Sequence, residues 1–329
     1  MKHTFHERQW RHGQRDSVRR RSLLAGGAGV LASAFAACGS PTPTASPAPV
    51  ASPTPSTPSL ATPSATATPS PTRPPPPPGP LGGVGTWRGA PDASQALADS
   101  GARWFYTWAP EHPEIKAPEG CEFVPMIQDE RQLTDSSLAL AKANGDTLLG
   151  FNEPELALQA NMSVDAALEA WPRLEETGLR VGAPALAGNA GNPNSWFAGF
   201  MRGVESRNHR VDFVPVHWYL APGLRESYSL DRAVDDLAGY ITRVHDTYGL
   251  PIWVSEFSLI TWYPARSDAM PPEDQAEFLA AAAEMMTSLA YVERWAWFSL
   301  TPPPYAPAVG AYDDSGQITP VGRQIRQLT

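Results

Sequence analysis

Two glutamates far apart in the sequence have surroundings that suit proton transfer or nucleophilic chemistry. Glu153 lies in the segment GFNEPE, residues 150–155, directly after an apolar run, and Glu256 lies inside the apolar segment PIWVSEFSL, residues 251–259. Burying a carboxylate in such a run is costly unless the group has a partner or a chemical task. An ion pair with an arginine such as Arg225 would explain Glu256 taken alone, so chemistry is favoured only if a second carboxylate shares its location.

Pro154 separates the two acids of the first segment. A residue that precedes proline is disfavoured in the helical region and is pushed toward extended geometry. We therefore expect Glu153 to be the last residue of a strand, and Glu155 to be an ordinary solvated acid at the surface or at a helix start. Of the two, Glu153 is the candidate for chemistry.

Strand-like segments alternate with helical patterns in the part of the chain that follows residue 80. Helical periodicity is clearest at 230–249, which ends in a glycine, and at 271–292, where apolar residues recur at three- and four-residue steps. Eight short apolar segments separated by helices, within 249 residues, favour an α/β fold of the (β/α)8 TIM-barrel type over an open sheet. The expected strands are 83–87, 103–108, 122–127, 147–153, 180–186, 212–220, 251–259 and 294–300.

In a barrel of this kind the active site lies at the carboxyl ends of the strands. Polar and aromatic residues occupy these ends in the sequence, so two carboxylates are expected on one rim. The candidates are Trp108 at the end of the second strand, Asn152 and Glu153 at the fourth, His217 and Tyr219 at the sixth, Glu256 at the seventh, Trp262 in the loop that follows it, and Trp297 at the eighth.

Two carboxylates that face each other across an aromatic pocket suit glycoside hydrolysis. One protonates the leaving oxygen, and the other attacks the anomeric carbon or activates water. The pKa of Glu153 is then expected to be raised by burial and by the negative charge of Glu256. A retaining enzyme would hold the two carboxyl groups about 5–5.5 Å apart. Of the eleven tryptophans, we expect Trp108, Trp262 and Trp297 to contact the ligand, and Trp104, Trp171, Trp253 and Trp295 to fill the core.

A resemblance to glycoside hydrolase family 128 is carried by the segments LLGFNEPE, QANMSVDAALEAWP, VGAPA, DFVPVHWY, PIWVSEFS and AWFS. The resemblance extends from about Trp104 to Arg326 and implies an endo-acting, retaining β-1,3-glucanase. In this reading Glu153 is the acid/base, and Glu256 is the nucleophile. The resemblance further implies that Asn152 contacts the sugar 2-hydroxyl, that Trp297 floors the cleft, and that His217 and Tyr219 orient Glu256. The proline-rich segments after strands seven and eight depart from the family, and such loops shape the subsites.

The charge of the segment 81–329 limits the partners that it can bind. The segment carries 32 acidic and 17 basic side chains, which argues against nucleic acid because phosphates would be repelled. A neutral or cationic substrate is favoured, here a polysaccharide. The seven histidines show no paired ligand spacing, so neither a metal nor a cofactor is expected. Cys121 is expected to be a buried free thiol, and the protein is expected to be a monomer.

The N-terminal residues are typical of an exported protein. Residues 1–38 combine the arginines of RRRSLL with a short apolar stretch and small residues, which resembles a twin-arginine export signal. The ending FAAC resembles a lipoprotein cleavage box, with Cys38 as the lipidated residue. Residues 39–80, rich in Pro, Ser, Thr and Ala, are expected to be a disordered linker before the barrel domain at 81–329. We expect a protein anchored outside the cell membrane only through its lipid, or otherwise secreted.

Three other readings remain open at this stage. The barrel could be a catalytically silent β-glucan-binding lipoprotein, although both glutamates are present. It could also act on a different β-linked polysaccharide, such as a β-1,4-glucan or a mannan. The linker alone would also fit a structural or adhesion protein attached to a cell wall.

Overall fold

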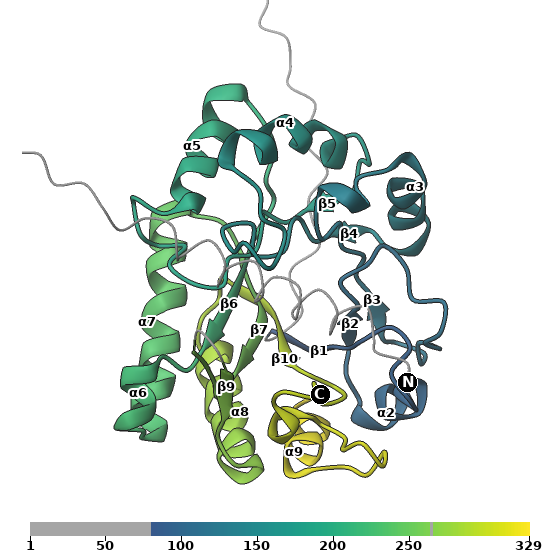
Figure 1. The fold of residues 1–329 in the computed structure, drawn as a ribbon, viewed down its shortest axis with the longest axis vertical. Coiled ribbons are helices and arrows are strands. Elements are labelled where there is room, and N and C mark those ends of the chain that lie inside the picture. The colour runs from purple at the N-terminus through teal and green to yellow at the C-terminus, as the bar shows by residue number, and fades with distance from the viewer. Residues whose placement is uncertain (1–79, 264–265) are drawn as a thin grey trace, which may run out of the picture. The chain divides into compact units, whose positions relative to one another are not determined.

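A computed structural model of the chain describes residues 80–263 and 266–329 (Figure 1). The expected export signal at 1–38, with Cys38, and the expected linker, apart from Pro80, lie outside the described residues. They therefore stay predictions. In the described part no helix has both the length and the apolar character needed to cross a membrane.

Eight parallel strands form a closed ring. Six of them pair side by side in the order β3-β2-β1-β10-β7-β6, and β4 pairs with β5. Single bridges from Met126 to Leu149 and from Gly182 to Phe213 connect β4 and β5 to their neighbours on either side, which closes the ring. The (β/α)8 barrel expected from the strand count is thus confirmed. The barrel strands are β1 (Leu81–Gly85), β2 (Trp104–Tyr106), β3 (Glu122–Phe123), β4 (Thr147–Leu148), β5 (Arg180–Val181), β6 (Val214–Tyr219), β7 (Ile252–Ser258) and β10 (Val292–Phe298).

Helices lie between the strands in sequence, and the longest of them run beside the sheet (Figure 1). Several begin at a Ser or Thr whose side chain accepts a backbone N–H of the first turn, as Ser163, Ser195 and Ser229 do. The helix expected at 230–249 ends at Gly249, whose φ of 64° suits glycine. The helices are α2 (Ala93–Ser100), α3 (Asp135–Asn144), α4 (Val164–Glu175), α5 (Trp196–Arg207), α6 (Pro222–Glu226), α7 (Leu230–Tyr248), α8 (Pro272–Thr287) and α9 (Pro320–Leu328), with short 3-10 turns η1 (Glu130–Gln132) and η2 (Pro307–Val309).

The alternation of side chains along the strands divides the core into two layers. One layer fills the inside of the barrel and includes Trp104, Val124, Phe213 and Trp253. The other layer lies between the strands and the helices and includes Phe105, Trp218, Phe257, Trp295 and Trp297. A register shift separates the pairs Val216–Val254 and His217–Glu256, so the extra residue, Ser255, lies on β7 and alternation along β6 is not interrupted. The ring of Trp218 accordingly faces the helices, where it stacks on Phe278 of α8.

The segment after β7 is a β-hairpin instead of the loop expected from its sequence. Strands β8 (Ile260–Tyr263) and β9 (Arg266–Ala269) pair in antiparallel fashion, with Trp262 opposite Ser267. Pairing satisfies the backbone groups of this segment and holds Trp262 on a strand. An ion pair of 2.9 Å between Arg225 and Asp268 ties α6 to the hairpin.

Gly150 allows β4 and β5 to approach closely just before the glutamate of the GFNEPE segment. A Cβ atom at this position would lie 2.7 Å from the carbonyl oxygen of Gly182 and 3.2 Å from the ring of Trp171. Only glycine avoids this overlap without a shift of the backbone. The close approach therefore helps to place Glu153 at the mouth of the barrel.

Candidate active site

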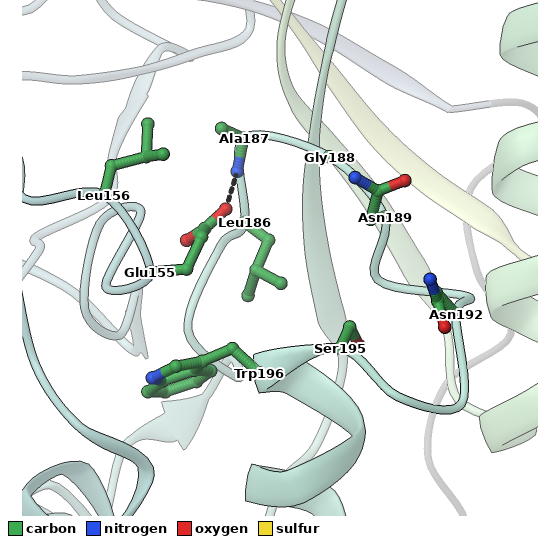
Figure 2. A pocket seen from close by; sticks show the side chains of 9 residues that line it. All are labelled: Glu155, Leu156, Leu186, Ala187, Gly188, Asn189, Asn192, Ser195 and Trp196. Atoms are coloured by element: carbon green, nitrogen blue, oxygen red, sulfur yellow. Dashed lines mark hydrogen bonds between the residues drawn. The ribbon is translucent and has the colours of Figure 1, made fainter. Parts of the chain in front are cut away.

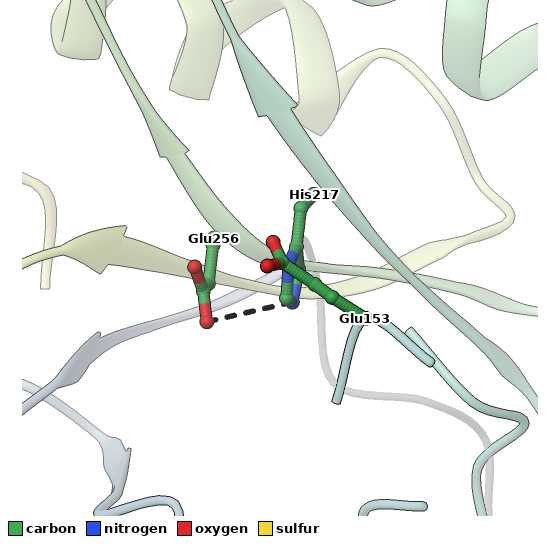
Figure 3. A group of neighbouring side chains, drawn as sticks. All are labelled: Glu153, His217 and Glu256. Atoms are coloured by element: carbon green, nitrogen blue, oxygen red, sulfur yellow. Dashed lines mark hydrogen bonds and ion pairs between the residues drawn. The ribbon is translucent and has the colours of Figure 1, made fainter. Parts of the chain in front are cut away.

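Glu153, His217 and Glu256 meet at the carboxyl ends of β4, β6 and β7 (Figure 3). The Nδ1 atom of His217 lies 2.8 Å from Oε1 of Glu153, and its Nε2 atom lies 3.5 Å from Oε1 of Glu256. The exposed fractions of the three residues are 6%, 0% and 4% in sequence order. One imidazole therefore lies between two buried carboxyl groups.

The backbone at Glu153 is not extended, contrary to the expectation from Pro154. Its φ is 46°, a left-handed value that is uncommon for a residue with a side chain. The N–H of Glu153 still donates to Ala185 on the neighbouring strand (2.7 Å), but its carbonyl accepts from the N–H of Leu156 (3.0 Å). The chain thus turns at Glu153 itself. Strained backbone of this kind is often found where a side chain must be aimed at a functional centre.

Three donors hold the carboxyl group of Glu256. Trp108 Nε1 donates to Oε1 at 2.9 Å, and the Tyr219 hydroxyl donates to Oε2 at 2.5 Å. The Tyr106 hydroxyl shares its one proton between Oε1 at 3.1 Å and the carbonyl oxygen of Ser255 at 3.0 Å. Hydrogen bonds from such donors stabilise the ionised form of a carboxyl group. The ion pair that would have explained Glu256 without chemistry is absent, because Arg225 pairs with Asp268 instead.

Burial and mutual charge shift the proton equilibria of this cluster. Burial raises the pKa of Glu153, and the negative Glu256 adds to the rise, while the hydrogen bond and charge of His217 oppose it. For His217, burial alone would lower the pKa, but Glu256, Glu153 and Glu155 outweigh it and raise the pKa above its ordinary value. A proton is therefore retained on the Glu153–His217 pair to a higher pH than either group would hold it in water.

The two tyrosines beside Glu256 remain neutral donors. Burial and the charge of Glu256 raise the pKa of Tyr106 and of Tyr219 well above the ordinary value for tyrosine. Each phenol consequently keeps the proton that it offers to the carboxylate.

Asn152 and Trp262 lie next to this cluster. Asn152 is buried, and its Oδ1 atom has no hydrogen-bond partner among the described residues. A buried acceptor without a partner needs a water molecule or a ligand. Trp262 is half-buried and meets the ring of Tyr219 edge to face, with 5.5 Å between the ring centroids.

Trp297 does not floor a cleft. It is fully buried in the layer between strands and helices, its Nε1 donates to the carbonyl of Val309 (2.8 Å), and its ring meets Phe257 edge to face. The next residue, Phe298, faces the barrel interior instead and meets the rings of Trp108 and Tyr219. Trp297 lies two residues after Trp295 and therefore shares its face of the strand.

Sequence reasoning missed Tyr106, Trp87 and Phe298. Trp87 stacks on Trp108 at 4.4 Å and an interplanar angle of 15°. Tyr106 could have been found, because Trp104, Tyr106 and Trp108 alternate along the second strand and so point to the same side. Trp87 and Phe298 have no such signal, since an aromatic residue near a strand end is as common in a core as in a site.

Glu155 is not the solvated surface acid that was expected. It is only partly exposed, and its Oε1 atom accepts the N–H of Ala187 at 2.8 Å. Burial, with a further contribution from Glu153, raises the pKa of Glu155 to about 7. Cys121, expected to be buried, is a free thiol at a half-buried position.

The central cluster also has the residue types of a metal site. Glu153, His217 and Glu256 each offer a ligand atom, and these atoms lie within 4.8 Å of one another. Each ring nitrogen of His217, however, already faces a carboxylate, which suits a shared proton better than a shared metal ion. The expectation that no metal or cofactor is needed stays a prediction.

A closed barrel with two carboxyl groups meeting at its mouth has the arrangement that a glycoside hydrolase requires. A family model described as "Glycosyl hydrolase catalytic core" matches residues 84–324. A solved GH128 (subgroup I) endo-β-1,3-glucanase from Amycolatopsis mediterranei, in complex with laminaripentaose, is 40% identical to the chain, with a TM-score of 0.70 over 76% of this chain and 100% of that one. The chain belongs to glycoside hydrolase family 128 and is an enzyme of that class.

The chain is also similar to two more distant proteins. A GH128 (subgroup III) enzyme from Blastomyces gilchristii, a curdlan-specific exo-β-1,3-glucanase in complex with glucose, is 28% identical, with a TM-score of 0.57 over 75% of this chain and 97% of that one. The Alkali-sensitive linkage protein 1 of Schizosaccharomyces pombe is 29% identical over 215 residues, which are 63% of this chain. That match spans only 36% of the yeast protein.

Proposed function

We propose that this enzyme cleaves internal β-1,3 bonds of glucan with retention of anomeric configuration. One observation carries the mechanism: a carboxyl oxygen of Glu153 and one of Glu256 lie within 4.8 Å of each other. Retaining glycosidases hold their carboxyl groups about 5–5.5 Å apart, whereas inverting enzymes need about 6.5–9.5 Å to admit a water molecule. The short separation supports direct attack by a carboxylate.

In the first step Glu153 gives its proton to the glycosidic oxygen while a carboxylate oxygen of Glu256 bonds to the anomeric carbon. The bond from that carbon to the leaving oxygen breaks, and a glycosyl-enzyme ester forms. In the second step Glu153, now ionised, takes a proton from water, and the water oxygen displaces Glu256. His217 contacts both carboxyl groups and can compensate the negative charge that moves between them.

The substrate assignment draws on relatives and on charge. The Amycolatopsis enzyme, 40% identical, is an endo-β-1,3-glucanase with a β-1,3-linked oligosaccharide bound. The chain's own acidic domain suits a neutral polymer. The free acceptor Oδ1 of Asn152 next to Glu153 supports a hydrogen bond to a sugar hydroxyl near the cleaved bond.

Product analysis with the full chain tests the proposal. Curdlan, laminarin, a β-1,4-glucan and a β-1,4-mannan are offered separately, and oligosaccharides from the β-1,3-glucans alone are expected. Early products of mixed length would support endo action, whereas a single short product would indicate exo action. Proton NMR of the first products should show the β anomer before mutarotation.

Two variants separate catalysis from silent binding. Glu256→Gln is expected to lose roughly 10³-fold or more in kcat while still binding glucan. In Glu256→Ala, azide should restore turnover and form an α-glycosyl azide, because azide then replaces the missing nucleophile. A parent protein that binds glucan without releasing reducing sugar would contradict the proposal and favour a binding lipoprotein.

We also propose that the protein is exported and anchored by a lipid on Cys38, and that it acts as a monomer. The twin-arginine-like residues and the FAAC ending support the first statement. Cell fractionation of the parent and of Cys38→Ala tests it, since loss of the lipid should release the protein from the membrane fraction. Light scattering of the purified protein tests the second.

A further inference from the structure

The β8–β9 hairpin and the β6–α7 connection are joined at two points. Inside the mouth, Trp262 of the hairpin meets the ring of Tyr219 edge to face, with 5.5 Å between the ring centroids. Outside the mouth, Asp268 of the hairpin forms an ion pair of 2.9 Å with Arg225 of α6, the helix that follows β6. Arg225 also donates to the Sδ atom of Met270 at 3.0 Å. Two contacts between the same two segments fix their relative orientation, which one contact would not do.

These two contacts use opposite faces of the hairpin. Residues that lie directly opposite each other in an antiparallel pair share a face, and neighbours along a strand alternate. Trp262 is paired with Ser267, whereas Asp268 is paired with Thr261. The face of Trp262 packs on the inner layer of the barrel, and the face of Asp268 turns to Arg225. The ion pair therefore holds the hairpin from the side opposite to Trp262.

The amide of Gln275, on α8, fixes only the base of the hairpin. Its Oε1 atom accepts the N–H of Leu259 at 2.9 Å, and its Nε2 atom donates to the carbonyls of Leu259 and Met270 at 3.1 and 3.2 Å. A rotation of the hairpin about this base would keep these bonds. Gln275 therefore anchors the hairpin to the barrel without fixing its approach to Tyr219.

Two further contacts of the hairpin do not link it to the β6–α7 connection either. Ser267 donates to the carbonyl of Tyr305 at 2.8 Å, in the connection after β10. Arg266 lies 3.7 Å from Asp268, but both residues belong to the hairpin. The ionic link from the hairpin to the segment that follows β6 is the one that Arg225 makes.

Tyr219 is the least covered of the three donors to Glu256. The other two are almost fully buried, whereas Tyr219 is only partly buried. Its ring meets two others edge to face, that of Phe298 in the barrel and that of Trp262 on the hairpin. If Trp262 moves away, the phenol gains freedom to leave its rotamer and to withdraw its proton from Oε2.

We propose that Arg225 is a positioning residue for attack by Glu256 on the anomeric carbon. Its ion pair with Asp268 keeps the hairpin against the β6–α7 connection, so that Trp262 confines Tyr219 and the phenol stays on Oε2. The inference rests on the proposed function, in which Glu256 is the nucleophile.

The acid Glu153 is held by separate contacts. Glu155 accepts the N–H of Ala187 at 2.8 Å and so fastens the turn at Glu153 to the β5–α5 connection (Figure 2). This bond involves no residue of the hairpin. Loss of Arg225 should therefore slow attack by the nucleophile without weakening protonation of the leaving group.

Arg225→Met and Asp268→Asn test the inference in the full-length enzyme. Each is expected to lower kcat on laminarihexaose about five- to tenfold, less than the complete removal of the Tyr219 hydroxyl would. In β-laminaribiosyl fluoride the leaving group needs no proton, and burst kinetics should show that the glycosyl-enzyme forms more slowly by the same factor. Arg225→Lys keeps the positive charge and should recover most of the rate.

A double-mutant cycle separates an effect through Tyr219 from a general structural effect. In the Tyr219→Phe background no hydroxyl is left to position, so Arg225→Met should lower kcat by less than about twofold. Equal losses in both backgrounds would overturn the inference, as would parent-like kcat in both Arg225→Met and Asp268→Asn. A rise in KM with unchanged kcat would also overturn it, because the ion pair would then support only uniform binding of the substrate.

Arg326→Met is the control for the loss of an ion pair. It separates α9 from Asp99 of α2, outside the site, and should leave kcat unchanged. Ion pairs with exposed members contribute little to stability, so each variant should unfold within about 4 °C of the parent. If Arg225→Met unfolds at a lower temperature than this, Asp268→Asn decides the kinetic outcome.

The inference and the proposed function fail in distinguishable ways. A parent enzyme that hydrolyses neither laminarihexaose nor the fluoride would overturn both. An active parent whose Arg225 and Asp268 variants behave like it would overturn the inference alone.

Discussion

The Nδ1 atom of His217 lies 2.8 Å from the Oε1 atom of Glu153. This contact couples the group that should act as acid to a buried base, and the other ring nitrogen of His217 lies 3.5 Å from Glu256. The imidazole thus contacts both carboxyl groups. The main consequence of this position of His217 is that it sets the pH range over which Glu153 keeps its proton.

Removing His217 should move the alkaline limb of the profile of kcat/KM against pH to higher pH. The hydrogen bond and charge of His217 lower the pKa of Glu153 against a rise caused by burial. Without them, as in His217→Leu, the pKa of Glu153 rises further, so the acid form persists to higher pH while kcat falls. Values of kcat/KM measured from acid to alkaline pH check this. As a control, His209→Leu removes an imidazole that contacts Glu175 outside the site and should leave the alkaline limb where it is. A shift of the alkaline limb to lower pH in His217→Leu would contradict the coupling of His217 to Glu153.

Glu153→Gln should damage the enzyme only where the leaving group needs a proton. General acid catalysis is typically worth about 10²–10⁴-fold, so hydrolysis of laminarin is expected to fall by that factor. In laminaribiosyl fluoride the leaving group is fluoride, which departs without protonation. The glycosyl-enzyme should therefore form from this substrate at a rate near that of the parent. Burst kinetics with the fluoride measure this step. If the variant lost the same factor in rate on both substrates, Glu153 would not be the general acid.

Tyr219→Phe should lower turnover without unfolding the protein. The variant removes the donor to Oε2 of Glu256, and a hydrogen bond to a charged group is worth about 1.5–3 kcal/mol. A fall in kcat of roughly 10–100-fold is therefore expected. Tyr291→Phe is a matched control, because its hydroxyl contacts Thr242 outside the site. If Tyr219→Phe had the kcat of the parent, Trp108 and Tyr106 would be sufficient to hold Glu256 for catalysis.

Glu155→Gln should remove a pH-dependent loss of stability. A carboxyl whose pKa is about 7 when folded, and about 4.3 when unfolded, stabilises the fold fully below the unfolded value. That contribution is lost as the pH rises through about 7, and it is on the order of 1–3 kcal/mol. The thermal unfolding temperature of the variant should match that of the parent near pH 4 and exceed it near pH 8. Glu169→Gln, at an exposed position of α4, is the control for the change of residue type.

Gly150→Ala should destabilise the barrel beside the catalytic strand. The added Cβ would meet the carbonyl of Gly182 at 2.7 Å and the ring of Trp171 at 3.2 Å, and overpacking of this kind costs about 1–3 kcal/mol. Denaturant unfolding measures the loss. Gly223→Ala, where nothing lies within 4 Å of the new atom, should be neutral. Equal stability of the two variants would show that β4 and β5 can separate without cost.

The sequence alone determined the barrel and the elements that carry the catalytic candidates. Strand and helix periods are local properties, and eight strands in this length leave little choice of architecture. The carboxyl ends of parallel strands meet at one rim, so the convergence of Glu153, His217, Tyr219 and Glu256 could be inferred from their places on the strands.

Only the tertiary structure decided how these side chains are used. Glu153 takes a left-handed backbone conformation against its local preference, because neighbouring strands and the turn to Leu156 constrain it. Glu155 is enclosed by a connection more than thirty residues away, and a sequence pattern carries no information on such a neighbour. Trp297 could have been assigned to the core from its spacing to Trp295, but the partner that buries its indole, Val309, comes from packing alone. Local pattern determines which face a residue occupies, whereas burial and charge depend on atoms that the chain brings together only when it folds.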